Sequence, residues 1–215
     1  MKIYDVSMLI SEDVQVYKNK EEKKPKFINA SNFSSSSVYE TNVCMNLHTG
    51  THMDFPLHMN KDGQTSDSLD LSKLIVPVKV FDLSYLEEVI DQKDLIHLDI
   101  ESGDFILLKT KNSYEDTFNF KFVYINQSAA SYLARRNIIG VGVDALGVER
   151  DQIGHPTHHI LMDAGAIIIE GLRLQEVPQG SYQMFALPIK MKGVEALLLS
   201  VILVEGYHDS MRNIR

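Results

Sequence analysis

The chain of 215 residues contains one cysteine, Cys44, and no tryptophan. A single cysteine excludes an internal disulfide and is typical of a reducing compartment, so we predict a cytoplasmic protein. Cys44 lies in a strand-like segment, and we expect it to be buried as a small apolar side chain. A role as a nucleophile would require a neighbouring base that activates the thiol.

Basic residues and long apolar runs are also scarce. Lysine and arginine total 21 against 29 acidic residues, and the formal net charge is −8. Nucleic-acid binding needs clustered positive charge, so we expect no nucleic-acid partner. The one dense basic stretch, residues 18–26, is interrupted by two glutamates, and we expect a solvated loop there. No apolar run approaches the roughly 18 residues of a membrane span, and the first residues do not resemble a signal peptide, so we expect no membrane partner.

The remaining composition is that of an ordinary globular protein, with 44% apolar and 23% charged residues. Segments that alternate like strands outnumber those with a helical period. No repeat or interdomain linker is visible, so we predict a single α/β domain over residues 1–215. Strands are predicted at 2–8, 38–48, 74–83, 104–110, 138–143, 166–170, 182–190 and 195–205, and helices at 85–90, 126–136 and 157–164.

Residues 48–58 read His-Thr-Gly-Thr-His-Met-Asp-Phe-Pro-Leu-His. This stretch places His48, His52, Asp54 and His58 at positions of the same parity. The glycine and the proline inside it disfavour a helix, and in an extended segment all four side chains project from one face. Such a row of polar side chains does not contribute to hydrophobic packing, but it can bind a divalent metal ion.

A second group of histidines occurs later in the chain. His155, His158 and His159 precede Glu170, which ends an aliphatic run where an unpaired carboxylate would be costly to bury. If a short helix carries His158 and the next strand ends at Glu170, the two side chains can converge on one point. The roles of His155, His159 and Asp144 stay open at this level.

Together the two groups offer imidazole and carboxylate donors for one metal ion, or for two ions that share a carboxylate. These donors suit zinc, manganese or ferrous iron, and the lack of thiolates argues against a closed structural zinc site. A divalent cation lowers the pKa of its water from about 15.7 towards 7 and polarises a carbonyl group. We therefore expect metal-assisted hydrolysis of a small-molecule substrate.

Residues 48–58 closely resemble the HxGTHxDxPxH signature of the metal-dependent cyclase family, which includes bacterial kynurenine formamidase (arylformamidase) and isatin hydrolase. Weaker likenesses extend over nearly the whole chain, at residues 4–7 (YDVS), 103–108 (GDFILL), 140–144 (GVGVD) and 158–172. The resemblance implies a strand-rich, swivelling β/β/α domain. It also implies a homodimer that binds one or two divalent ions, with Zn²⁺ expected first and Mn²⁺ as the alternative.

The resemblance also assigns roles by motif position. His48, His52 and Asp54 would bind one ion, and Asp54 would bridge to a second ion held by His158 and Glu170. His58, the last residue of the signature, would be the general base or acid, since a neutral imidazole can take a proton from water and return it to a leaving amine.

The chain departs from the family in two places. The early Trp-Pro-Gly or Tyr-Pro-Gly turn is replaced by VYKNK at 16–20, and the RTGW-like segment reads KTKN at 109–112. Both regions help to shape the substrate pocket of formamidases. The resemblance implies cleavage of a C–N amide bond, with N-formylkynurenine as the leading candidate substrate. Two alternatives stay open: a metal-dependent lyase or cyclase that acts through an enolate, and a non-catalytic metal-binding module.

Overall fold

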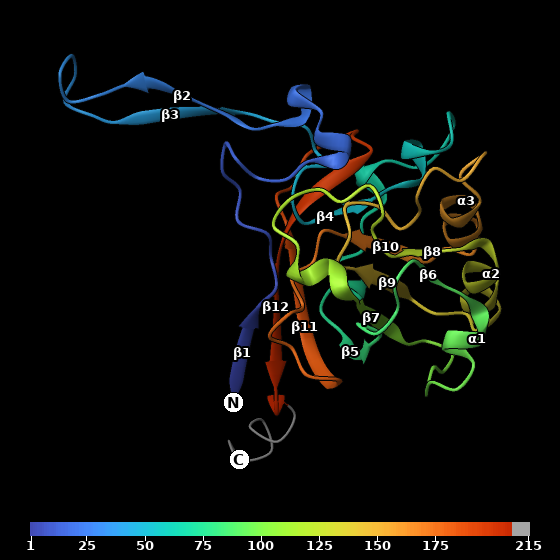
Figure 1. Cartoon of the computed structure of the whole chain (residues 1–215). Helices are drawn as coiled ribbons and strands as arrows, with labels where there is room; N and C mark the ends of the chain where they lie inside the picture. Colours follow the sequence, from blue (N-terminus) through green and yellow to red (C-terminus); the bar gives the residue numbers. More distant parts are fainter. Residues whose placement is uncertain (208–215) are drawn as a thin grey trace.

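A mixed sheet of eight strands forms the centre of the computed structural model, which describes residues 1–207. The strand order is β1-β12-β11-β5-β7-β9-β10-β4, and β4 also pairs with β12, so the sheet closes into a barrel with β1 outside it (Figure 1). The strands are β1 (Lys2–Asp5), β4 (His52–Asp54), β5 (Pro77–Asp82), β7 (Phe105–Lys109), β9 (Gly140–Val143), β10 (Ile167–Glu170), β11 (Gly180–Pro188) and β12 (Ala196–Glu205).

Three helices, α1 (Gln92–Leu95), α2 (Gln127–Arg135) and α3 (Pro156–Asp163), lie together on one outer side of the barrel (Figure 1). Apolar side chains form two large core layers, one inside the barrel and one between the sheet and the helices, and a smaller third cluster around Phe118 and Phe122. Neighbouring residues of β7 show the division, since Leu107 faces the barrel interior and Ile106 faces the helix layer. Among residues 1–207, no helix is long and apolar enough to cross a membrane.

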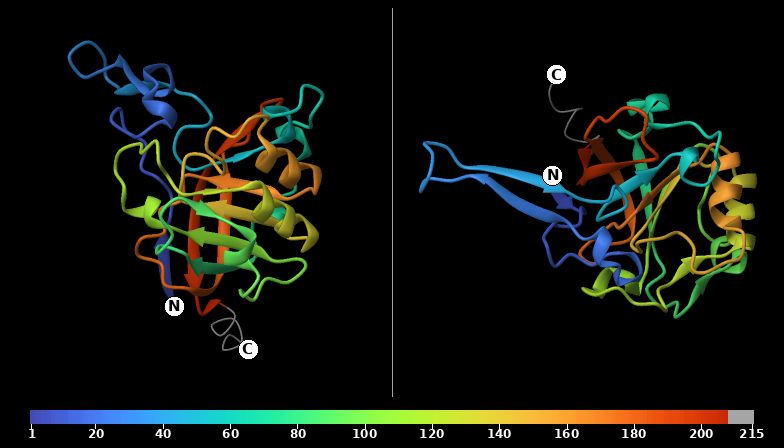
Figure 2. Two further views of the ribbon diagram at one scale, coloured as in Figure 1. Left: turned by 45° about the vertical axis from the view of Figure 1, so that its right-hand side comes forward. Right: turned by 90° about the horizontal axis from the view of Figure 1, so that it is seen from above.

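The strands β2 (Lys26–Ser31) and β3 (Glu40–Cys44) form a hairpin that extends away from the barrel (Figures 1 and 2). Within residues 1–207, β3 pairs with β2 alone, and all its residues are exposed. Cys44 is therefore exposed, and the prediction that it is buried was wrong. The alternating pattern correctly indicated a strand, but it carried no information about whether a second layer covers that strand.

Most of the predicted elements are confirmed, and so is the strand-rich α/β class. Asn126 caps α2 as expected, because its side chain accepts a hydrogen bond from the backbone N–H of Ala129. The predicted helix at 85–90 was wrong. Its end instead forms β6 (Val89–Ile90), which pairs with β8 (Tyr124–Ile125) and buries Ile90.

The start of α3 was also placed wrongly. The helix begins at Pro156 with His155 as its N-cap residue. Proline fits this first position because its missing N–H would have no partner in the helix anyway. Thr157 lies inside the helix, and its hydroxyl donates to the backbone oxygen of Ile125. The helix end was correct, since Gly165 follows it with a φ of 74°.

Candidate metal centre

The motif at 48–58 consists of three local structures, so the prediction of a single extended segment was wrong. Only His52 and Asp54 lie on a strand, β4, whereas His48 belongs to the preceding turn and His58 to a 3-10 turn that begins at Pro56. The first turn depends on the glycine between the two histidines, Gly50. This residue has a φ of 72°, a left-handed conformation in which any residue with a Cβ would be strained.

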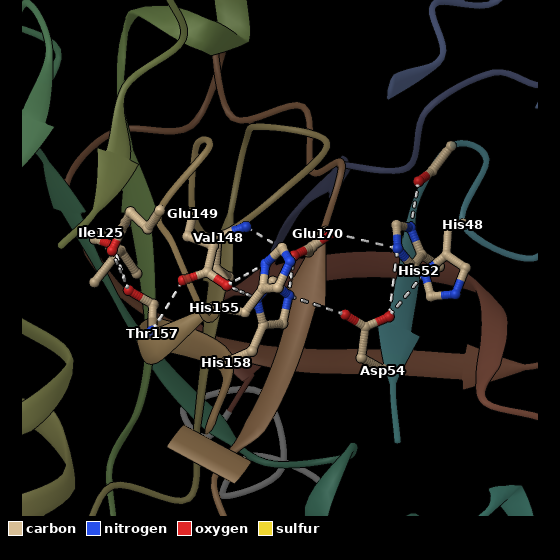
Figure 3. A network of polar contacts seen from close by, with 12 residues as sticks. His48, His52, Asp54, Ile125, Val148, Glu149, His155, Thr157, His158 and Glu170 are labelled. Carbon is tan, nitrogen blue, oxygen red and sulfur yellow. Dashed lines mark hydrogen bonds and ion pairs between the residues drawn. The ribbon is translucent and has the colours of Figure 1, made fainter. Parts of the chain in front are cut away.

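Strand pairing brings the two halves of the site together. In the antiparallel pair of β10 and β4, Glu170 lies opposite His52, and residues directly opposite each other share a face of the sheet. Asp54 lies two positions further along the same face, while Met53 packs into the barrel interior. The first turn of α3 then places His158 beside the same carboxylates (Figure 3).

The distances within this group are those of a ligand set. His52 Nε2 lies 3.5 Å from Asp54 Oδ1 and 3.4 Å from Glu170 Oε2. His158 Nε2 lies 3.5 Å from Glu170 Oε1 and 3.7 Å from Asp54 Oδ2. Two ligand atoms that each lie about 2.1 Å from a tetrahedral metal ion are about 3.4 Å apart. His48 joins from the turn, with its Nδ1 atom 3.1 Å from Asp54 Oδ1.

Three atoms of this group are buried without a hydrogen-bond partner within residues 1–207: His52 Nε2 and both carboxylate oxygens of Asp54. A buried polar atom without a partner is costly. The other ring nitrogen of His52, Nδ1, lies 2.9 Å from the carbonyl oxygen of Gly50. A carbonyl can only accept, so Nδ1 donates a proton to it, and Nε2, which faces the carboxylates, is the nitrogen that could bind a cation once it is deprotonated. This donor set fits a divalent cation.

The charges in the group also suit a divalent cation. Burial alone would raise the pKa of Asp54, but contacts with His158 and His48 hold this pKa well below its usual value. Burial and the charge of Asp54 oppose ionisation of Glu170, yet contacts with His158 and His52 lower its pKa to about 2. Burial opposes the charged form of His158 as well, but Asp54, Glu149 and Glu170 raise its pKa well above the usual value. Both carboxylates are therefore anionic at neutral pH.

His58 stands at the edge of the group. Its ring centroid lies 4.1 Å from that of His48 and 5.7 Å from that of His158. Burial lowers the pKa of His58 to about 4, so this imidazole is neutral at pH 7 and can accept a proton. It can also approach a cation directly, because one of its nitrogens lies within 4.8 Å of ligand atoms of His48 and Asp54.

Glu149 is a member of the site that the sequence reasoning missed. Its Oε1 atom accepts hydrogen bonds from His158 Nδ1 at 2.6 Å and from His155 Nδ1 at 3.0 Å, and Oε2 accepts from the N–H of Thr157 at 2.9 Å (Figure 3). A carboxylate behind an imidazole fixes the tautomer and the orientation of the ring. Its only signal in the sequence is faint: an acidic residue lies nine positions before His158.

His155, His159 and Asp144, whose roles the sequence left open, lie at three different positions relative to the ligand group. His155 lies at the cavity edge with an exposed side chain, whereas His159 is half-buried and does not line the cavity. Asp144 lies outside the ligand group. It is buried and accepts hydrogen bonds from Thr110 and Ser113, so it anchors the turn that follows β7.

A cavity of about 350 Å³ adjoins the group and includes His48, His58 and His158 in its lining. This volume suits a small molecule. Lys18 and Lys23, from the segment between β1 and β2, also line it. The expectation that residues 18–26 form a solvated loop agrees with the exposed Lys18 but was wrong for Lys23, which is half-buried.

Comparisons with known proteins agree with the fold and the motif. A family model described as "Putative cyclase" matches residues 4–150. The kynurenine formamidase of Salinibacter ruber is 32% identical over 206 residues, which cover 94% of this chain and 97% of that protein. A solved structure of a predicted metal-dependent hydrolase from Bacillus stearothermophilus is 50% identical with a TM-score of 0.87, over 94% of this chain and 97% of that one.

A more distant structure, isatin hydrolase A from Ralstonia solanacearum, is 22% identical with a TM-score of 0.79, over 95% of this chain and 92% of that one. At this identity the likeness concerns the fold. The family model spans more than half of the chain, and the Salinibacter protein aligns over nearly all of it. The resemblance seen in the motif is thereby confirmed, and the chain belongs to the cyclase family.

Proposed function

We propose that the protein is a metal-dependent hydrolase that cleaves the C–N amide bond of a small molecule, with N-formylkynurenine as the leading candidate substrate. One observation carries the proposal: a buried set of imidazole and carboxylate atoms without hydrogen-bond partners adjoins a cavity of small-molecule size. The match to a kynurenine formamidase over 94% of this chain supports the choice of a formamide.

In this proposal His48, His52 and Asp54 bind one divalent ion, and His158 and Glu170 hold a second. The two oxygens of Asp54 support a bridging role, because Oδ1 faces His48 and His52 while Oδ2 faces His158. Zn²⁺ is the first choice and Mn²⁺ the alternative, because both accept nitrogen and oxygen ligands.

A divalent ion bound in this site would lower the pKa of water and polarise the formyl carbonyl. His58 performs the proton transfers: as a neutral imidazole in the cavity wall it takes a proton from the attacking water and returns it to the leaving amine. The carbon–nitrogen bond breaks, a new carbon–oxygen bond forms, and the products are the free amine and formate.

The test is turnover of N-formylkynurenine by protein stripped with a chelator and then reloaded with Zn²⁺ or Mn²⁺. We expect activity to disappear on stripping and to return on reloading, and formate made in ¹⁸O-labelled water to carry the label. Turnover that survives complete metal removal would overturn the proposal. Product without solvent oxygen would instead indicate a lyase or cyclase.

We also propose a single domain over residues 1–215, a cytoplasmic location and a homodimer. The extended hairpin supports the dimer, because it exposes Ile28, Tyr39 and Val43, and a two-stranded hairpin alone is marginally stable in water. A second copy of this chain is the partner that would cover it. Sedimentation of the wild type and of a Tyr39→Ser, Val43→Ser variant tests this, and a monomeric wild type would refute it.

A further inference from the structure

Lys23 lines the cavity, and the proposed chemistry gives it no role. Its side chain is half-buried and lines the same cavity as His48 and His58. Within residues 1–207 its ammonium group forms no ion pair. Its Nζ atom lies 5.5 Å from the centroid of the Tyr17 ring. Lys18, which also lines the cavity, is already paired with Asp151 at 2.6 Å.

The position of Lys23 is fixed relative to the metal-binding motif. Its backbone oxygen accepts a hydrogen bond of 2.8 Å from the hydroxyl of Thr49. Thr49 is fully buried and directly follows His48 in the chain. The lysine is therefore tethered to the candidate metal centre, although it comes from the segment between β1 and β2.

The electrostatics of this lysine are unfavourable in the free protein. Burial lowers the pKa of Lys23, and the neighbouring charge of Lys20 lowers it further. Partial desolvation of an ammonium group that has no anion beside it disfavours its charged form. The carboxylates Glu170, Asp54 and Glu22 attract it without forming an ion pair, and metal ions bound to Glu170 and Asp54 would offset their share of that attraction. An anion that enters the cavity would supply the missing partner.

We propose that Lys23 forms an anion subsite, which selects substrates that carry a carboxylate apart from the bond to be cleaved. The carboxylate lies against the ammonium of Lys23 while the scissile amide lies at the metal centre. The role of this subsite in the reaction rests on the proposed hydrolase function, but anion binding at Lys23 can be tested without turnover. N-Formylkynurenine has such a carboxylate in its amino-acid group, whereas a simple formanilide has none.

The binding test uses the zinc-loaded protein and two probes of equal shape, 3-benzoylpropionate and its neutral amide. By calorimetry we expect the wild type to bind the carboxylate at least about 10-fold more tightly than the amide, as for a hydrogen bond to a charged group. Lys23→Met should abolish this preference and leave the zinc content unchanged, and Lys23→Arg should restore much of it. Lys121→Met, at an exposed lysine outside the cavity, is the matched control.

A preference for the carboxylate that persists in Lys23→Met would show that the metal ions alone attract it, and would overturn the subsite. An equal loss of this preference in Lys18→Met would also overturn the subsite, because the preference would then come from the overall electrostatic potential of the cavity and not from Lys23. The wild type must bind at least one probe, and failure to bind either would contradict the inference.

Kinetics separates this inference from the proposed function. In Lys23→Met, kcat/KM for N-formylkynurenine should fall about 10- to 100-fold, mainly through KM, with little change for 2-formamidoacetophenone, which lacks the carboxylate. If the wild type hydrolyses neither compound but keeps the probe preference, the hydrolase proposal fails and the subsite stands. If it hydrolyses both and Lys23→Met affects them equally, the subsite fails and the hydrolase proposal stands.

Discussion

Replacing Glu149 by glutamine tests how the chain prepares His158 to bind a cation. The carboxylate accepts from three donors: His158 and His155 on one oxygen, and the N–H of Thr157 on the other. A carboxamide has one oxygen and one NH₂ group, so it cannot satisfy both sides. Each of its two orientations has a distinct and measurable cost.

If the amide oxygen faces the histidines, the NH₂ group opposes the N–H of Thr157 and leaves a buried donor without a partner, which costs about 1–3 kcal/mol of folding free energy. If the NH₂ group faces His158, the imidazole must accept on Nδ1 and carry its proton on Nε2. That tautomer has no lone pair for a metal ion. Loss of the carboxylate that orients a metal-binding imidazole typically weakens metal binding about 10- to 100-fold, which corresponds to about 1.4–2.7 kcal/mol of binding free energy.

The assay is a calorimetric titration of chelator-stripped protein with Zn²⁺, combined with urea unfolding of the metal-free form. Glu149→Gln should show weaker zinc binding, a lower unfolding midpoint, or both. Glu12→Gln, at an exposed glutamate, is the control for the change in net charge. Wild-type zinc affinity together with a wild-type midpoint in Glu149→Gln would refute the assigned role of this carboxylate.

Two further predictions concern protons at the site. In zinc-saturated protein, His58→Gln should lower kcat about 10²- to 10⁴-fold. His159→Gln, at a histidine that does not line the cavity, should keep the wild-type kcat, and equal effects of the two substitutions would contradict the role of His58. The pKa of His158 is raised in the metal-free protein, and a metal ion needs the deprotonated Nε2 atom. Zinc affinity should therefore increase with pH as this proton is lost, and calorimetry in buffers of different ionisation enthalpy should detect proton release. Zinc affinity that does not change between pH 6 and 8 would contradict this predicted release of a proton from His158.

The sequence allowed the motif to be recognised but gave the wrong local geometry for it. The spacing of His48, His52 and Asp54 indicated a shared face, and these side chains do converge. The convergence depends on a turn at Gly50 as well as on strand alternation. The turn also makes contacts with distant residues, such as the hydrogen bond from the hydroxyl of Thr51 to the backbone oxygen of Gly171, and local spacing does not contain them.

Residues brought in by tertiary structure were the least predictable. The pairing of Glu170 with His52 follows from the register of β10 and β4, and the sequence could suggest only that such convergence was possible. Glu149 lies in a loop and Lys23 ends a short 3-10 turn, so no hydrophobic periodicity placed either residue at the site. Cys44 was misplaced for the related reason that exposure of the hairpin depends on what lies beside it.

The central claim is that the buried carboxylates and imidazoles around Asp54 hold a divalent cation. Elemental analysis of untagged protein, purified without chelators, tests this most directly, with Asp54→Asn as the comparison. We expect one to two equivalents of zinc or manganese in the wild type and a strong loss in Asp54→Asn, because that residue faces both groups of ligands. Wild-type protein that contains no transition metal, and takes up none from excess Zn²⁺ or Mn²⁺, would contradict the account.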